Sequence, residues 1–314
     1  MGGPRIRSGE RSNPMVAENH IMTEQVGAFV PFETGEGVVV SVHSSAVNVR
    51  RPGGLLLSVV EKPSQMTSLS LCAPALFQIS GGRRPSVLPG ERVVLRRDSL
   101  RLGGLCLDLK RAKAWKGTLH EKLLRGFSMD RLSLIKEALL ESGKKEGLLG
   151  LIGGRGDLNR FAHYASHKLR ARPFEGHDKP RLKGLSSLIG LGPGFTPSGD
   201  DFVTGVLAGE SIGQTLRRPL PEIDRGDLSA SLRKTNDAGR TLLWQALQGH
   251  FPCYLTEALK GLVKAKSLRA IGKVVSRAVA HGETSGTDAL AGMVWYWQRL
   301  TRPWNPSGGI SYRR

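Results

Sequence analysis

The sequence is short of several residue types on which whole classes of protein depend. Its three cysteines, Cys72, Cys106 and Cys253, lie far apart and form no CxxC pair. This pattern argues against a disulfide framework or a zinc site, and it fits a reducing cytoplasm. Aromatic residues make up only 6% of the chain, and it contains no RNP, helix-turn-helix or zinc-knuckle pattern. We therefore rank nucleic-acid binding last among the candidate functions.

Long apolar runs are missing as well. No stretch approaches the ~20 apolar residues that a membrane-spanning helix needs, so we expect no membrane segment. Residues 1–24 are polar and basic and lack the apolar core of a secretory signal. We expect a disordered basic lead there, with Met15 or Met22 as alternative starts, and a flexible tail over residues 301–314. These features predict a cytoplasmic protein.

Acidic residues are few beside the basic ones. The chain has 46 Lys and Arg against 27 Asp and Glu, a formal net charge of +19. The electric field of so positive a protein attracts polyanions, and it attracts small anionic substrates and acidic partner subunits in the same way. Because the excess is spread along the chain, a solvated basic face is the plain interpretation. A surface that steers small anions is the functional one, and a small anionic substrate is the partner that we expect.

The first part of the chain has the pattern of short strands. Between residues 25 and 116, β-branched runs of strand length alternate with Gly- and Pro-containing turns. Strands of this length and spacing are typical of an antiparallel barrel or sandwich and not of βαβ units. We therefore predict a β-rich domain over residues 25–116. Its predicted strands cover residues 38–43, 46–49, 55–60, 68–72, 76–80, 92–95 and 102–109.

Beyond residue 116 the apolar residues recur at helical spacing. Ser128 is expected to cap a helix that Gly143 ends, and Asp157 to start the next helix. The predicted fold class is α+β, a β-rich N-terminal domain followed by a mainly α-helical C-terminal domain over residues 117–300. Residues 170–183 are polar and basic, and we expect a loop that could order on binding. The remaining helices are predicted over residues 200–216, 236–247, 254–264, 267–280 and 285–300.

Residues 190–201, with the sequence GLGPGFTPSGDD, form the most informative stretch. Its glycines let the backbone approach a ligand and adopt positive φ, and its prolines stiffen the loop. The helix that follows offers N–H groups and a partial positive charge that suit phosphate or carboxylate. The spacing is that of neither a Walker A loop nor a dinucleotide fingerprint. The substrate-binding candidates in this loop are Gly192, Gly194, Thr196, Ser198 and Gly199.

Two adjacent acids close this loop and open the predicted helix. Asp200 and Asp201 could cap the helix and complement its dipole, which is the structural interpretation. After a rigid loop they could also hold Mg²⁺ or orient a substrate amine, and we treat both as catalytic candidates. The sequence identifies no cofactor with certainty, and Mg²⁺ bound by this pair is the one metal that it suggests.

A second junction, over residues 282–292, has the same composition: a Gly- and hydroxyl-rich turn before an apolar helix. Thr284, Ser285 and Gly286 are its substrate-binding candidates, and Asp288 is its catalytic candidate. Neither a core nor a simple turn requires two such junctions, so we predict that they face each other across one pocket. Their carboxylates would repel an anion unless a cation or a ligand N–H group lies between them. No His–acid pair accompanies the serine of either junction, so we expect these serines to bind a ligand and not to act as nucleophiles.

Both junctions, together with the stretch HSSAVN at residues 43–48, resemble the AllH-like family. This family is the small subunit associated with oxamate carbamoyltransferase in anaerobic allantoin breakdown, and it was long catalogued as a domain of unknown function. Its hallmark GLGPGxTPSGDDF is similar to residues 190–202, and its SGxDxLxG stretch to residues 285–292. The resemblance extends over residues 37–298.

The resemblance implies a carbamoyl-transfer system for small anions such as oxamate and carbamoyl phosphate, in which partner subunits take part. It also adds His43 and Asn48 to the substrate-binding candidates. The family more often has His where this chain has Glu283, and the nearest histidine here is His281. The leading prediction is a carbamoyltransferase-like enzyme subunit. The alternative is a non-catalytic ligand-binding or assembly subunit of a multi-subunit enzyme.

Overall fold

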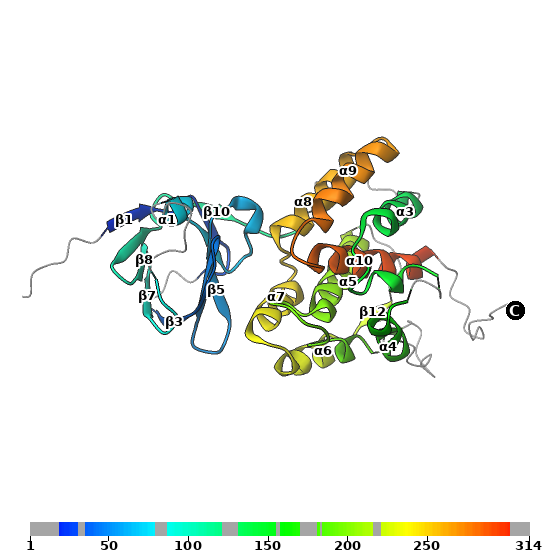
Figure 1. Ribbon diagram of the computed structural model, residues 1–314, viewed down its shortest axis with the longest axis horizontal. Coiled ribbons are helices and arrows are strands. Elements are labelled where there is room, and N and C mark those ends of the chain that lie inside the picture. The colour runs from blue at the N-terminus through cyan, green and yellow to red at the C-terminus, as the bar shows by residue number, and fades with distance from the viewer. Residues whose placement is uncertain are drawn as a thin grey trace, which may run out of the picture.

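The chain forms a curled β-sheet followed by a group of helices that lies beside it (Figure 1). The computed structural model describes residues 19–30, 35–78, 87–120, 131–154, 158–169, 181–182, 184–215 and 221–301. This order of elements confirms the predicted α+β class, with a β-rich N-terminal part and a mainly helical C-terminal part. The predicted division at residue 116 stays a prediction. None of the described helices combines the length and apolarity that crossing a membrane requires.

The N-terminal part is a single ten-stranded sheet in the order β1-β9-β8-β7-β3-β4-β5-β6-β2-β10. Neighbouring strands are antiparallel except in the pairs β1–β9, β2–β10 and β5–β6. The sheet is strongly curled, because the two residues that connect β1 to β2 bond to strands near opposite ends of the sheet. Thr23 donates its N–H to Asp108 O in β9, and Glu24 donates its N–H to Cys72 O in β6. The strands are β1 Asn19–Met22, β2 Gln25–Gly27, β3 Gly35–Val42, β4 Ala46–Arg50, β5 Leu56–Val60, β6 Ser70–Cys72, β7 Arg92–Arg96, β8 Ser99–Leu102, β9 Leu105–Asp108 and β10 Lys113–Trp115.

Three details of the sheet differ from the sequence prediction. Residues 76–80 were expected to form a strand, but helix α1 covers Pro74–Gln78, because proline suits the first turn of a helix, where its missing N–H is not needed. The strand expected over residues 102–109 is a hairpin, β8 and β9, which turns at Gly103 with φ +59°. Strand β1 begins within the expected lead of residues 1–24, so the sheet starts earlier than predicted.

The C-terminal part contains the predicted helices with small shifts at their ends. Asn236 and Ser267 cap α7 and α9 by accepting hydrogen bonds from backbone N–H groups in the first turn. Asn159, and not Asp157, caps α4, while the expected cap at Ser128 lies outside the described residues. The α-helices are α3 Leu132–Ser142, α4 Arg160–Lys168, α5 Ser198–Thr215, α6 Arg225–Ser231, α7 Asp237–Leu247, α8 Cys253–Lys264, α9 Leu268–Val279 and α10 Ser285–Thr301.

The chain also contains several short elements. Helix α6 and most of these short elements were not predicted. Within the loop expected over residues 170–183, the described residues Arg181–Leu182 form a strand that pairs with β12. The short elements are η1 Pro63–Gln65, η3 Leu149–Leu151, η5 Leu185–Ser187, η6 Leu232–Lys234, β11 Arg181–Leu182 and β12 Glu222–Ile223. The expected tail over residues 301–314 lies outside the described residues beyond Thr301.

Helices α5 and α10 form the centre of the helical part and pack against each other at very short range (Figure 1). A Cβ atom added to Gly205 would overlap the carbonyl oxygen of Ala289, and one added to Gly292 would overlap that of Phe202. Further along, the Cα of Gly209 faces the ring of Tyr296. Ser198 and Thr284 are in contact at the helix starts, and Gly209 lies beside Tyr296 further along, so α5 and α10 run parallel and begin side by side.

Candidate functional site

The two glycine- and hydroxyl-rich junctions face each other in direct contact, as predicted, while the pocket expected between them stays a prediction. Thr196 Oγ1 and Ser285 Oγ are 3.2 Å apart, and so are Ser198 Oγ and Thr284 Oγ1. Each pair joins the loop before α5 to the turn before α10. The parallel packing of these helices brings their first turns together, since glycines allow the close approach.

The two junctions also match each other residue by residue, which the sequence analysis did not recognise as a repeat. Each helix begins with the order Ser-Gly-x-Asp: residues 198–201 in α5 and residues 285–288 in α10. Gly199 packs against the backbone of Leu188, and Gly286 against that of Ala278, in the same position of each helix. The two helix starts are therefore related by a local pseudo-twofold axis. Close backbone packing accounts for both of these glycines, which were predicted to bind substrate.

The loop itself uses N–H groups that were expected to bind an anion. The N–H of Gly199 donates to Leu191 O, and those of Asp200 and Asp201 donate to Pro197 O. In α10, Gly286 and Asp288 also donate their N–H groups to preceding carbonyls. The loop can fold back in this way because its glycines at 190, 192 and 194 have positive φ. The expectation that the N–H groups at the helix starts bind an anion is therefore wrong for Gly199, Asp200, Asp201, Gly286 and Asp288, which bond within the protein.

Asp200 anchors the loop from inside the protein. One carboxylate oxygen accepts the N–H of Gly190 at 2.7 Å, and the other accepts the hydroxyl of Thr235. Burial raises the pKa of Asp200 to about 6, although both hydrogen bonds favour the ionised form. Both oxygens have protein partners, so the geometry fits an anchor better than the catalytic role that was predicted.

Asp201 and Asp288 occupy the same position of the two helix starts and influence each other. Asp201 is buried and accepts a hydrogen bond from Thr196 Oγ1 at 3.0 Å. Burial raises the pKa of Asp201 well above its ordinary value, and the charge of Asp288 raises it further. When one carboxyl of such a pair is ionised, the other favours its protonated form. The pair thus supplies a donor as well as acceptors.

Asp288 is completely buried and has one oxygen without a partner. Its Oδ1 accepts the N–H of Leu148 at 2.6 Å, but no described residue hydrogen-bonds to Oδ2. Burial raises the pKa of Asp288 to about 6, while the Leu148 N–H and the nearby hydroxyls of Thr284 and Ser198 oppose this shift. At neutral pH this carboxyl is therefore mainly ionised, with an acceptor open to a ligand.

Sequence analysis missed Tyr254, the second residue of α8. Its hydroxyl is buried and has no hydrogen-bond partner among the side chains and backbone that the structure describes. Its ring stacks on that of His281, with centroids 4.0 Å apart and planes at 16°. Burial raises the pKa of Tyr254, and the charges of Asp201 and Asp288 add to this effect. Tyrosine in an amphipathic helix has no local pattern that could have marked it.

The two candidates from the β-rich part have different surroundings. His43 is exposed at the end of β3, where its ring meets that of Phe195 in the glycine-rich loop, with centroids 6.0 Å apart. Asn48 is buried in the sheet, where it donates to Ser41 Oγ at 2.9 Å and accepts from Ser58 Oγ at 2.7 Å. The structure thus brings His43 to the loop and leaves Asn48 bonded within the sheet.

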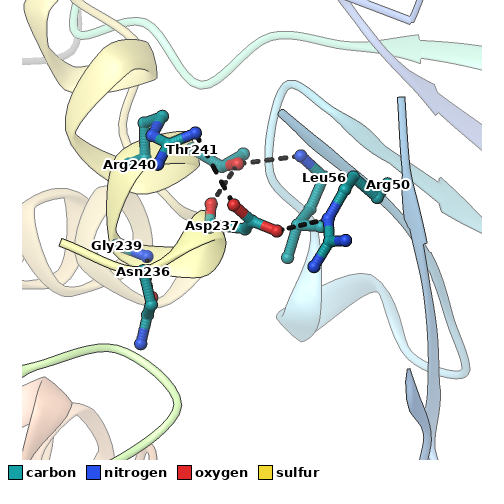
Figure 2. Close-up of polar contacts among 7 residues, drawn as sticks. All are labelled: Arg50, Leu56, Asn236, Asp237, Gly239, Arg240 and Thr241. Carbon is teal, nitrogen blue, oxygen red and sulfur yellow. Dashed lines mark hydrogen bonds and ion pairs between the residues drawn. The ribbon is translucent and has the colours of Figure 1, made fainter. Parts of the chain in front are cut away.

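Helix α7 contacts both the sheet and the glycine-rich loop, and Figure 2 shows its contacts with the sheet. Asp237 in its first turn pairs with Arg50 of β4 and with Arg240, and Thr241 Oγ1 accepts the N–H of Leu56 at 2.8 Å. The cap residue Asn236 donates to the carbonyl oxygen of the loop residue Phe195 at 3.0 Å. The position of the loop therefore depends on contacts with both parts of the chain.

The donor set does not fit the Mg²⁺ that the sequence suggested. Within the described ranges, no group of three or more His, Cys, Asp and Glu side chains is placed to hold a metal ion. Asp200 and Asp201, although adjacent in sequence, bond to different partners.

Comparison with known proteins gives one match, in the part of the chain that carries both junctions. The family model described as oxamate carbamoyltransferase subunit AllH matches residues 188–297. No curated protein and no solved structure matches the chain. The matched range runs from just before the glycine-rich loop to near the end of α10. This confirms the resemblance to the AllH-like family over residues 188–297, which hold two of its three motifs, while the resemblance over the rest of residues 37–298 stays a prediction.

Proposed function

We propose that this chain is a subunit of a carbamoyltransferase-type enzyme and binds a small anion that carries a carbamoyl or amide group. Oxamate and carbamoyl phosphate are the substrates of this class. The observation that carries the proposal is the paired start of α5 and α10, where Asp201 and Asp288 share one buried cluster with four hydroxyl groups. We further propose other subunits of such an enzyme as its partners and the cytoplasm as its location.

The chemistry of carbamoyl transfer suits this set of groups. The reaction requires a polarised carbonyl and a stabilised leaving group, tasks for fixed donors placed where charge develops. Protonated Asp201 and the hydroxyls can donate to oxygen atoms of the ligand, while ionised Asp288 can accept from its NH₂ group. An ester or a simple carboxylate offers no such N–H donor. The net charge of +19 draws anions toward the protein without selecting among them.

Binding to the full-length chain tests this proposal. Isothermal titration with oxamate and with carbamoyl phosphate should show saturable binding to the wild type. Asp201→Ala should lose it, because the methyl group has neither the donor nor the acceptor of the carboxyl that Thr196 and Ser285 contact. Asp227→Ala, the same change in the exposed first turn of α6, is the matched control and should bind as wild type does. Wild type that binds neither compound, or Asp201→Ala that binds both normally, would contradict the proposal.

A non-catalytic ligand-binding or assembly role is the second candidate, and one observation favours it. The N–H groups of Gly199, Asp200 and Asp201 bond within the protein, and so do both carboxylate oxygens of Asp200, as in a scaffold. A coupled assay separates the two roles. With partner subunits present, Asp201→Ala should reduce the rate of carbamoyl phosphate turnover if this site reacts. It should leave the rate unchanged if the site only holds the assembly together.

A further inference from the structure

Two buried polar atoms near the paired helix starts lack the hydrogen bonds that buried groups normally have. They are Tyr254 Oη and Asp288 Oδ2, and neither has a partner among the described residues. Most buried polar groups in native proteins are paired, and an unpaired one is costly, so each such atom requires an explanation. One is a donor and the other an acceptor; Tyr254 lies within range of the charge of Asp288 and stacks on His281, just before the start of α10.

The surroundings fix both atoms in place. The ring of Tyr254 stacks on His281, which precedes α10, and burial lowers the pKa of that histidine, so the stacked ring is neutral. Asp288 is held through its other oxygen by the N–H of Leu148. Gly147, beside it, has no room for a Cβ because that atom would overlap the carboxylate. A rigid donor and a rigid acceptor are what selective recognition of a polar group needs.

We propose that Tyr254 Oη and Asp288 Oδ2 together recognise the –CO–NH₂ group of the ligand. This inference rests on the proposed function and names the part of the substrate that the site selects. Tyr254 donates its hydroxyl hydrogen to the carbonyl oxygen, and Asp288 accepts a hydrogen from the NH₂ group. The half-buried hydroxyls of Thr284 and Ser285 lie on the outer side of the cluster and bind the anionic end.

The pairing distinguishes an amide from a carboxylate. A carboxylate in the same position has no hydrogen for Asp288 and would place a second negative charge beside it. An amide satisfies both protein atoms at once. A site built to bond an N–H group rejects an analogue that lacks one, since the buried acceptor is then left unpaired. Oxamate should therefore bind and oxalate, its close analogue without the amide, should not compete well.

An internal water molecule could also satisfy both atoms, and the experiment distinguishes this case. Isothermal titration of the full chain with oxamate and with oxalate is measured for wild type and three variants. Tyr254→Phe keeps the ring and its stacking and should weaken oxamate binding about tenfold with little effect on oxalate. Asp288→Asn replaces the open acceptor by a donor, so it should weaken oxamate and strengthen oxalate. Tyr296→Phe removes the hydroxyl of another buried tyrosine, on α10, and should change neither affinity.

Each outcome decides a separate point. Equal oxamate affinities for wild type, Tyr254→Phe and Tyr296→Phe would overturn the amide subsite and leave the proposed function intact. Wild type that binds neither oxamate nor carbamoyl phosphate would overturn both. If Tyr254→Phe lowers the affinities for oxamate and oxalate equally, the substitution has disturbed the shape of the site and not the recognition of an amide. That result also overturns the subsite. Thermal melting of each variant checks folding, and Tyr254→Phe alone decides the matter if Asp288→Asn does not fold.

Discussion

The hydroxyl oxygens of Thr196 and Ser285 lie 3.2 Å apart, although 89 residues separate them in the sequence. The same Thr196 donates to Asp201, so one contact ties the glycine-rich loop, the start of α10 and a buried acid together. This contact exists only because α5 and α10 approach each other backbone to backbone. The stability of the site should therefore depend on residues that touch no ligand.

Gly205→Ala tests the close packing of α5 on α10. A methyl group at this position would overlap the carbonyl oxygen of Ala289, so the two helices must separate. We expect the free energy of unfolding to fall by about 3 kcal/mol, measured by urea denaturation. Gly272→Ala in α9 is the control, because no described heavy atom lies within 4 Å of its new methyl group. It should gain up to about 1 kcal/mol from helix propensity, and equal stabilities of both variants would contradict the packing argument.

Replacement of two buried tyrosines by phenylalanine should have opposite effects on stability. Tyr254→Phe removes a hydroxyl without a partner in the described residues, so the free energy of unfolding should stay the same or rise by up to about 1 kcal/mol. Tyr296→Phe removes a hydroxyl that donates to Pro221 O, and should cost about 1 kcal/mol. Thermal and chemical denaturation compare the two. A larger loss for Tyr254→Phe would mean that its hydroxyl has a stabilising partner.

Asp288 should make the protein less stable as pH rises. Burial raises its pKa from 3.8 to about 6, so the folded state holds this proton more tightly than the unfolded state. The stabilisation that comes from this proton is fully present below the pKa of the unfolded state. It is lost as pH rises through about 6, which lowers the free energy of unfolding by about 3 kcal/mol. Asp288→Asn has no such proton and should gain stability relative to wild type across this range. Unfolding curves whose difference is independent of pH would show that Asp288 is not strained by burial.

The contacts of α7 with the sheet should contribute unequally to the free energy of unfolding (Figure 2). Thr241→Val leaves the buried N–H of Leu56 without its acceptor and should cost about 1–3 kcal/mol. Arg50→Ala removes an ion pair with Asp237 in which the arginine side chain is 55% exposed, and should cost less than about 1 kcal/mol. Denaturation in low and high salt checks both, since only the ion pair is screened. A larger loss for Arg50→Ala would reverse this order.

Local pattern was enough to predict much of the fold. Strand-length β-branched runs and Gly-Pro turns indicated the β-rich part, and helical spacing of apolar residues indicated most of the helices. These features were predictable because they depend on neighbouring residues. Where two local preferences competed, as at Pro74, the sequence prediction was wrong, since apolar residues suit either element and the proline favours a helix start.

The sequence by itself determined the AllH-like motifs and the two acids, Asp201 and Asp288, that begin matching helices. Only the tertiary structure decided which groups these acids meet. It bonded Asp200 inside the protein, left one oxygen of Asp288 open, and brought Tyr254 of another helix to the same cluster. The physical reason is that burial and hydrogen-bond partners come from residues far apart in the chain. Periodicity and motif spacing describe only what lies within a few residues.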